Sequence, residues 1–276
     1  MIRTLGSGPP LVMIPGVDGH CTWLQPVLEE LSRHFTVITF SLWGERDSGQ
    51  RFDESRGFEP HLAQVDEALR HAGVERATLC GVSYGGWVAL SYAARHPERV
   101  DALVLVSTPP PAFQPNHMQR RYLGAPIISA PVFVLTAPGR VLPEVFAALP
   151  TWRERLRFGA GQLSRVARTG LSPTRMAARM RIAKGVDFFE ACRRITMPTL
   201  VVTGQPGLDR VVPVEETWKY LKLIPGSESL RLRGGHVCTH MQPCTFANAV
   251  LSWRRGDRDS VDERNSGAGG TPRSAA

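Results

Sequence analysis

The chain has 276 residues, of which 42% are hydrophobic and 21% are charged, and its formal net charge at pH 7 is +8. This share of hydrophobic residues is large enough to form one sizeable core with an insertion. The protein is therefore not an intrinsically disordered chain. No apolar run approaches about 18 residues, so we expect no transmembrane helix.

The cysteines and the N-terminus indicate the compartment. The first ten residues contain no apolar stretch long enough for a secretion signal. The cysteines are odd in number and scattered through core-like segments: Cys21, Cys80, Cys192, Cys238 and Cys244. This pattern is typical of reduced thiols and not of a disulfide framework, so we expect a cytoplasmic protein.

Strand-like apolar runs alternate with helical segments along most of the chain. Strands are predicted at residues 11–15, 36–41, 77–82, 101–107, 198–204 and 227–233, with at best one edge strand at 2–5. Helices are predicted near residues 22–34, 59–72, 84–95, 214–223 and 243–255. This alternation predicts an α/β fold, with a mostly parallel central sheet and helices on both faces.

Residues 109–195 interrupt the alternation. Three prolines at 109–111 mark the exit from the regular pattern, and Pro198 marks the return. We therefore expect a core made of residues 1–108 and 196–255 with an insertion between them. Residues 256–276 are too poor in apolar side chains to bury a core, and they are predicted to form a disordered tail.

The segment Gly81-Val82-Ser83-Tyr84-Gly85 joins a predicted strand to a predicted helix. A sharp strand-to-helix turn with a serine at its apex is the nucleophile elbow. Its backbone is strained, so the residues two before and two after the serine must be small, and here both are glycine. The alternative is a glycine-rich turn with an incidental serine.

Two further polar residues follow predicted strands. Asp209 lies just beyond the strand at 198–204, and His236 follows Gly234 and Gly235 after the strand at 227–233. Loops after the strands of a parallel sheet concentrate its chemistry. A serine hydroxyl needs a base such as His236, and Asp209 would orient the imidazole. The alternatives are a surface carboxylate for Asp209 and an ordinary loop histidine for His236.

In this order, Ser83, Asp209 and His236 resemble the catalytic triad of the α/β-hydrolase superfamily, and the resemblance runs from about residue 10 to residue 255. It implies an oxyanion hole made of the backbone N–H groups of Val17 and Tyr84. The family loop before the first donor usually begins His-Gly, whereas this chain has Pro15-Gly16. The alternative is that Pro15-Gly16 is merely a turn.

The resemblance also assigns the insertion and a loop at the active-site mouth. In the superfamily, a helical cap over the site is inserted where this chain has residues 109–195. The loop at 41–49 departs from the family pattern at Ser41 and Arg46, and Trp43 within it is a candidate for substrate binding. A tryptophan packed on the core is an equal alternative.

The insertion carries the charge of the chain. Residues 151–185 contain nine Arg or Lys residues and only Glu154 as an acid. Such a patch could guide anionic substrates, an acidic partner such as a carrier protein, or an acidic membrane surface, and no motif for specific nucleic acid recognition accompanies it. A solvated helical face is the alternative.

A metal site would compete with the triad for His236. His236, Cys238, His240 and Cys244 lie within nine residues, but their spacing does not match the usual paired zinc patterns. We therefore expect no metal and no cofactor.

Together these features predict a serine hydrolase that cleaves a carboxylic ester, or a related acyl compound with an apolar acyl group, through an acyl-enzyme on Ser83. Two alternatives remain open. The same triad supports acyl transfer to an alcohol or thiol, and the fold alone is compatible with a non-catalytic binding protein.

Overall fold

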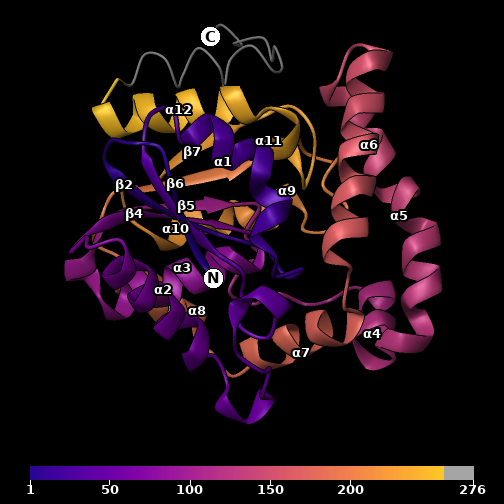
Figure 1. Ribbon diagram of the computed structural model, residues 1–276, viewed down its shortest axis with the longest axis horizontal. Coiled ribbons are helices and arrows are strands. Elements are labelled where there is room, and N and C mark those ends of the chain that lie inside the picture. Colours follow the sequence, from indigo (N-terminus) through magenta and orange to yellow (C-terminus); the bar gives the residue numbers. More distant parts are fainter. Residues whose placement is uncertain (258–276) are drawn as a thin grey trace, which may run out of the picture.

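A seven-stranded sheet runs through the centre of the molecule, as Figure 1 shows for the computed structural model, which describes residues 1–257. The strands are β1 (Ile2–Leu5), β2 (Pro10–Ile14), β3 (Thr36–Phe40), β4 (Ala77–Val82), β5 (Val100–Val106), β6 (Thr199–Thr203) and β7 (Glu228–Arg231). Their order across the sheet is β1-β3-β2-β4-β5-β6-β7. Only β1 runs antiparallel to its neighbour, so the prediction of a mostly parallel sheet is confirmed.

The central strands are short apolar runs because helices cover both faces of the sheet. Every residue of β4 and β6 is buried, as expected for parallel strands with no face in water. Ile14 pairs with Gly81, and Val106 pairs with both Val82 and Val202. The carboxyl ends of β2, β4, β5 and β6 therefore reach the same edge of the sheet, where the following loops meet.

Helices pack on the two faces of this sheet. The outer helices are α1 (Gln25–Leu31), α2 (Glu59–His71), α3 (Tyr84–Arg95), α9 (Val214–Thr217), α10 (Lys219–Leu223), α11 (Cys238–Met241) and α12 (Pro243–Arg255). One apolar cluster joins the sheet to α2, α3 and α10, and a second joins its other face to α1 and α12. The two layers lie below and above the sheet in Figure 1.

The insertion between β5 and β6 is helical. It consists of α4 (His117–Gly124), α5 (Pro126–Ala148), α6 (Trp152–Thr169), α7 (Pro173–Ala183) and α8 (Phe188–Arg193). Helices α5 and α6 stand on the right of Figure 1, beyond the sheet. The last helix belongs to the core by its packing, because the Phe188 ring stacks on Trp87 of α3 with centroids 4.6 Å apart. The limits 109 and 195 stay a prediction.

Helix α5 is long and apolar enough to cross a membrane, although the sequence showed no such run; the expectation of no transmembrane helix stays a prediction. It has 23 residues and meets that criterion by length and composition. Three prolines and the polar Thr136, Arg140 and Glu144 interrupt its apolar residues, so no continuous run is visible in the sequence. The average hydropathy over the whole helix is therefore high, although each uninterrupted apolar stretch within it is short.

The other element predictions differ in detail. The segment predicted as a helix at 22–34 begins as a 3₁₀ turn (Cys21–Leu24) before α1, and the helix predicted at 214–223 is divided into α9 and α10. Helix α11, directly after the histidine loop, was not predicted. The five cysteines are free thiols, and the cytoplasmic location stays a prediction. The predicted tail lies outside the described residues except for Gly256 and Asp257.

Substitution of Gly85 tests how closely helix α3 packs against the end of β2. A Cβ atom on Gly85 would lie 2.4 Å from the Ile14 carbonyl oxygen and 2.5 Å from that of Pro15. Gly85→Ala should therefore lower the free energy of unfolding by about 3 kcal/mol, measured by urea denaturation, because backbone atoms cannot yield cheaply. Gly124→Ala is the control, since a Cβ there meets no atom within 4 Å. Equal stability of the two variants would contradict the close seating.

Candidate active site

Ser83 occupies a strained turn between β4 and α3. Its backbone has φ 52° and ψ −118°, a conformation that a residue with a Cβ atom rarely adopts. Its N–H donates to the Val106 carbonyl at 2.7 Å, which fixes the turn to the neighbouring strand. A Cβ on Gly81 would lie 2.2 Å from the Gly85 carbonyl oxygen, so the turn closes only with both glycines. Such strain is found where function requires it.

Asp209 and His236 are brought together from different loops. Asp209 Oδ2 lies 2.9 Å from His236 Nδ1, while its Oδ1 accepts hydrogen bonds from the amides of Val211 and Val212 at 2.9 and 2.8 Å. The carboxylate is buried and cannot rotate without losing these bonds. It holds the proton of the neutral imidazole on Nδ1, which leaves Nε2 as the free base.

Carboxylates raise the proton affinity of His236. Burial disfavours the imidazolium and by itself lowers the pKa of His236, but the charge and hydrogen bond of Asp209 raise it, as do the charges of Glu144 and Asp18. The pKa of His236 therefore lies above the ordinary value of 6.5. The imidazole is well suited to take up a proton and to hold it briefly.

Glu144 reaches this site from helix α5 of the insertion. Its Oε2 accepts hydrogen bonds from the Gly235 amide at 2.8 Å and the Val237 amide at 3.1 Å, on either side of His236. Burial raises the pKa of Glu144 to about 7. The insertion thus holds the backbone of the histidine loop in place.

An apolar pocket of about 400 Å³ opens in front of the serine. Val17, Ser83 and Tyr84 line its floor, and side chains of α4, α5 and α7 form most of its walls. The amides of Val17 and Tyr84 donate to no acceptor in the hydrogen bonds of residues 1–257. Two amides beside the serine that have no internal acceptor are what an oxyanion hole requires.

The structure connects the serine to the histidine only indirectly. Among the described residues, no hydrogen bond joins the Ser83 hydroxyl to His236, and such bonds are often long without substrate. Asp18 lies near both residues. Its Oδ2 is 3.2 Å from the Cβ position of Gly16, the Ser83 Cβ is 3.7 Å from the same point, and the Asp18 charge acts on His236.

Arg179 of helix α7 forms several hydrogen bonds to the loops next to Ser83. It is fully buried and donates to the carbonyl oxygens of Val17 at 2.9 Å, Asp18 at 3.2 Å and Trp43 at 3.0 Å. It also pairs with Glu45 at 2.8 Å, which pairs in turn with Arg175. A cation of the insertion therefore fixes the loop that carries the Val17 amide.

Trp43 does not line the pocket in front of Ser83. Its side chain is buried, and its ring lies 5.0 Å from that of Phe52 and 6.3 Å from that of His61. Trp43 is therefore packed on the core, as the alternative interpretation of the sequence had it, and it is not in a position to contact a substrate in this pocket. The pocket is instead enclosed by the insertion, whose packing one sequence does not fix.

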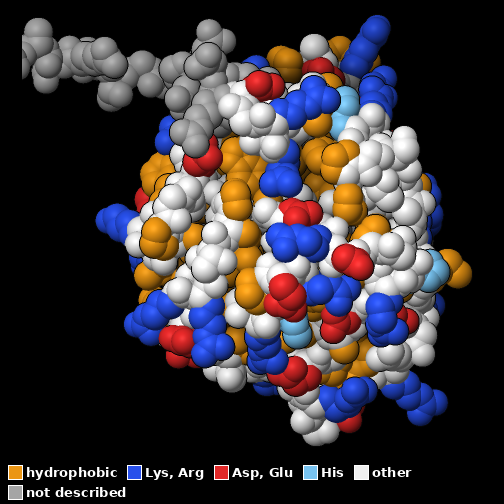
Figure 2. Space-filling view, turned by 90° about the vertical axis from the view of Figure 1, so that its left-hand side faces the viewer, with side chains coloured by type: hydrophobic (Ala, Val, Ile, Leu, Met, Phe, Trp, Pro, Cys, Tyr) orange, Lys and Arg blue, Asp and Glu red, His pale blue; other side chains and the backbone are white. Residues whose placement is uncertain are grey.

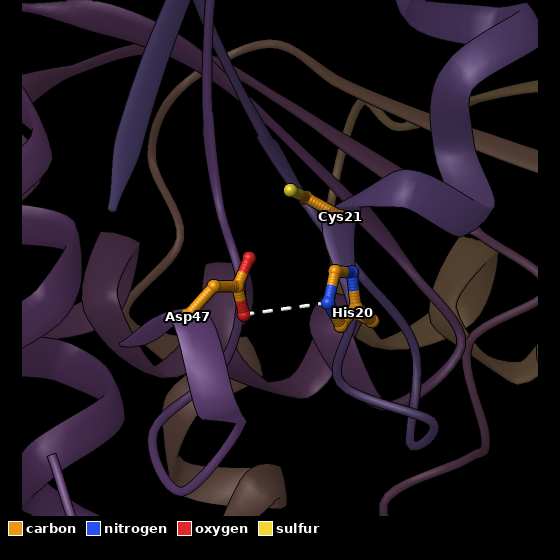
Figure 3. Close-up of side chains that lie close together, drawn as sticks. All are labelled: His20, Cys21 and Asp47. Atoms are coloured by element: carbon orange, nitrogen blue, oxygen red, sulfur yellow. Dashed lines mark ion pairs between the residues drawn. The ribbon is translucent and has the colours of Figure 1, made fainter. Parts of the chain in front are cut away.

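The only described group of three potential metal ligands lies elsewhere, between the loops after β2 and β3 (Figure 3). In Figure 3 the His20 ring faces the Asp47 carboxylate, and their atoms are 3.4 Å apart. Asp47 also accepts a hydrogen bond from Ser41 at 2.8 Å, and Ser41 lies 3.5 Å from the Cys21 sulfur. These contacts join two loops without a metal. His236, considered in sequence as a ligand, pairs with Asp209.

The sequence interpretation missed Asp18, Glu144 and Arg179. Asp18 stands in the loop already assigned to the oxyanion hole, where a titratable group was visible. Glu144 is the single acid between residues 109 and 153, an unusual residue in so apolar a stretch. Arg179 carries no such signal, because it is one of nine basic residues in its segment.

The comparisons with known proteins agree with this geometry. Residues 9–126 match the family of the alpha/beta hydrolase fold. The chain is 26% identical over 257 residues to a pimeloyl-[acyl-carrier protein] methyl ester esterase of Vibrio vulnificus, covering 91% of this chain and 96% of that protein.

Solved structures extend the likeness to the whole molecule. A thermophilic esterase from Thermogutta terrifontis superposes with a TM-score of 0.75 at 25% identity, covering 93% of each chain. An enol-lactonase from Burkholderia xenovorans has the same TM-score at 18% identity, covering 92% of this chain and 96% of its own, and so shares the fold. This chain therefore belongs to the α/β-hydrolase superfamily and is an enzyme of the hydrolase class.

Proposed function

We propose that this enzyme cleaves a carboxylic ester with an apolar acyl group through an acyl-enzyme on Ser83. The observation that carries the proposal is the 2.9 Å pair of His236 and Asp209, held at the same sheet edge as the strained serine. The esterases among the similar proteins support the same class of substrate. No metal or cofactor takes part in the proposed chemistry.

In the first half-reaction, the Ser83 hydroxyl attacks the ester carbonyl carbon while His236 Nε2 takes its proton. The carbonyl oxygen becomes an oxyanion facing the Val17 and Tyr84 amides. The carbon–oxygen bond to the alcohol then breaks, and the imidazolium returns its proton to the leaving alkoxide. Asp209 stabilises the imidazolium throughout.

In the second half-reaction, water takes the place of the alcohol. His236 removes a proton from the water as it attacks the acyl carbon of the Ser83 ester. The oxyanion forms again at the same two amides and collapses by expelling the serine oxygen, which recovers its proton from His236. The carboxylic acid leaves, and the enzyme is restored.

The pocket indicates an apolar acyl group. Its walls are made mostly of apolar side chains, and its two arginines already have partners. Arg140 donates to the Phe133 carbonyl at 2.7 Å, and Arg210 donates to the Gly139 carbonyl at 2.9 Å. A hydrocarbon chain would therefore gain more from this pocket than a charged group, since burial of apolar surface stabilises by roughly 25 cal/mol per Å².

Ser83→Ala tests the nucleophile. We expect the wild-type enzyme to hydrolyse p-nitrophenyl esters and to prefer acyl chains longer than acetyl, because the pocket is apolar. The variant should lose at least about 10³-fold in kcat without loss of thermal stability. Ser91→Ala in helix α3 is a matched control that lies outside the pocket. Equal activity of wild type and Ser83→Ala would contradict the proposal.

The pH–rate profile tests the base. Neutral imidazole is the active form, so kcat/KM should fall as the pH drops through the pKa of His236, which lies above 6.5. Glu144→Gln keeps an oxygen acceptor for the two amides and removes the negative charge that Glu144 gains as the pH rises through its pKa of about 7. It should therefore shift this acid limb to lower pH. A limb at or below 6.5 that the variant leaves unmoved would count against the assignment.

Arg179→Met tests whether the insertion positions the oxyanion loop. Loss of the bonds to the Val17 and Asp18 carbonyls should lower kcat by about 10- to 100-fold with little change in KM, because the Val17 amide acts only on the transition state. Arg175 still pairs with Glu45 in this variant, which limits the loss of stability.

Arg181→Met is the matched control for Arg179. Arg181 lies on the same helix, and its pair with Glu54 is exposed. It should retain wild-type kcat. If both variants lose kcat equally, or if Arg179→Met changes KM alone, Arg179 does not act through the oxyanion loop.

A further inference from the structure

The outer face of helix α5 is apolar and uncovered in the described part of the chain. Ile128 and Leu135 are 82% and 78% exposed, and they lie seven residues apart on one side of the helix. Ile127, Val132, Val134, Leu142 and Phe146 are exposed as well. A continuous exposed apolar face of this length marks an interaction surface.

The two charged residues of α5 do not break this face. Arg140 donates to the Phe133 carbonyl and to Thr136 of its own helix, and Glu144 is buried against the histidine loop. Both ionisable side chains of the helix are therefore engaged within the protein. The exposed side of α5 offers only apolar contacts.

Helix α6 continues the surface and adds positive charge. Trp152, Leu156 and Leu163 follow one another at helical spacing and are 64%, 62% and 71% exposed. Arg153, Arg157 and Arg168 are exposed beside them. The single acid of α6, Glu154, is bound to Thr151 in the cap of the helix.

This surface differs from the opposite side of the molecule. Figure 2 faces the side away from α5 and α6, and there acidic and basic side chains are interspersed. Pairs such as Arg76–Asp101 and Arg95–Glu59 neutralise one another among the core elements. Among residues 1–257 the arginines of α6 form no such ion pairs, and Glu154 and Glu29 act on them only through their charge.

We propose that the outer faces of α5 and α6 dock the enzyme on an anionic lipid bilayer. Arginine binds phosphate headgroups, tryptophan favours the boundary between headgroups and acyl chains, and the leucines and isoleucines insert beneath. A second copy of this chain would bring the arginines of two α6 helices together, which is unfavourable. An acidic soluble protein would neutralise the arginines and leave the apolar face of α5 in water.

The same helix separates this surface from the pocket. Pro126, Ser129, Ala130 and Phe133 of α5 line the pocket in front of Ser83. A docked enzyme would therefore hold the pocket one helix away from the bilayer, where esters with long acyl chains dissolve. This source of substrate rests on the proposed function, whereas the docking itself does not.

Vesicle binding by the Ser83→Ala protein tests the docking without turnover. Sedimentation is measured with phosphatidylcholine vesicles and with vesicles that contain phosphatidylglycerol as an anionic lipid. We expect at least 10-fold stronger partitioning to the anionic vesicles, and most of this difference should disappear at high salt.

Two pairs of substitutions test the two halves of the surface. Ile128→Glu with Leu135→Glu, and separately Arg153→Glu with Arg157→Glu, should each weaken anionic-vesicle binding by at least 10-fold. The control, Arg70→Glu with Arg255→Glu, changes the net charge as much as the Arg153 and Arg157 pair does, but at exposed positions on α2 and α12. It should leave vesicle binding unchanged. All three proteins, with Ser83 restored, should hydrolyse a short soluble ester as the wild type does.

Several results would overturn the docking. These are equal partitioning to both kinds of vesicle, an equal loss in the control protein, and a dimer in light scattering that Leu135→Glu dissociates. Binding of an acidic carrier protein without any binding of vesicles would do the same. Failure of ester hydrolysis with vesicle binding intact would instead refute the proposed function alone.

Discussion

The strained backbone of Ser83 is the constraint on which the rest of the site depends. A serine held at φ 52° requires glycines at 81 and 85, close packing of α3 against β2, and a hydrogen bond to Val106. This packing supplies the restraint that keeps an unfavourable conformation in place. As a result, the hydroxyl stands at the end of a buried strand, beside two amides that have no hydrogen-bond acceptor within residues 1–257.

The helical insertion does more than cover the pocket, because it is bonded to each loop of the site. Arg179 binds the loop that carries Val17, Glu144 binds the amides on both sides of His236, and Gln119 donates to the Val211 carbonyl beyond Asp209 at 2.9 Å. Movement of the insertion would therefore shift the loops of the proposed oxyanion hole, base and acid together. The insertion supplies no residue of the proposed triad, yet it contacts every loop that carries one of the proposed site residues other than Ser83.

Local patterns in the sequence predicted most of the fold and pointed to the residues of the proposed triad. The strands predicted from short apolar runs agree with the structure to within about two residues at either end, because parallel strands buried on both faces are marked in the sequence itself. The glycines around Ser83 and the Gly-Gly before His236 indicated the turns for the same reason. Partners distant in sequence were not predictable. Nothing in the local sequence distinguishes Arg179 from its basic neighbours or shows that Trp43 turns into the core. Nor does the sequence show that α5 exposes one apolar face to solvent and lines the pocket with the other.

The covalent intermediate is the most direct test of the central claim, that the strained turn presents Ser83 as the nucleophile. A p-nitrophenyl butyrate reaction would be quenched with acid in its first turnovers, digested and examined by mass spectrometry. The account predicts a butyryl group on the peptide that contains Ser83, and its absence when position 83 is alanine. An acyl group found on another residue, or full turnover with Ser83 never acylated, would contradict it.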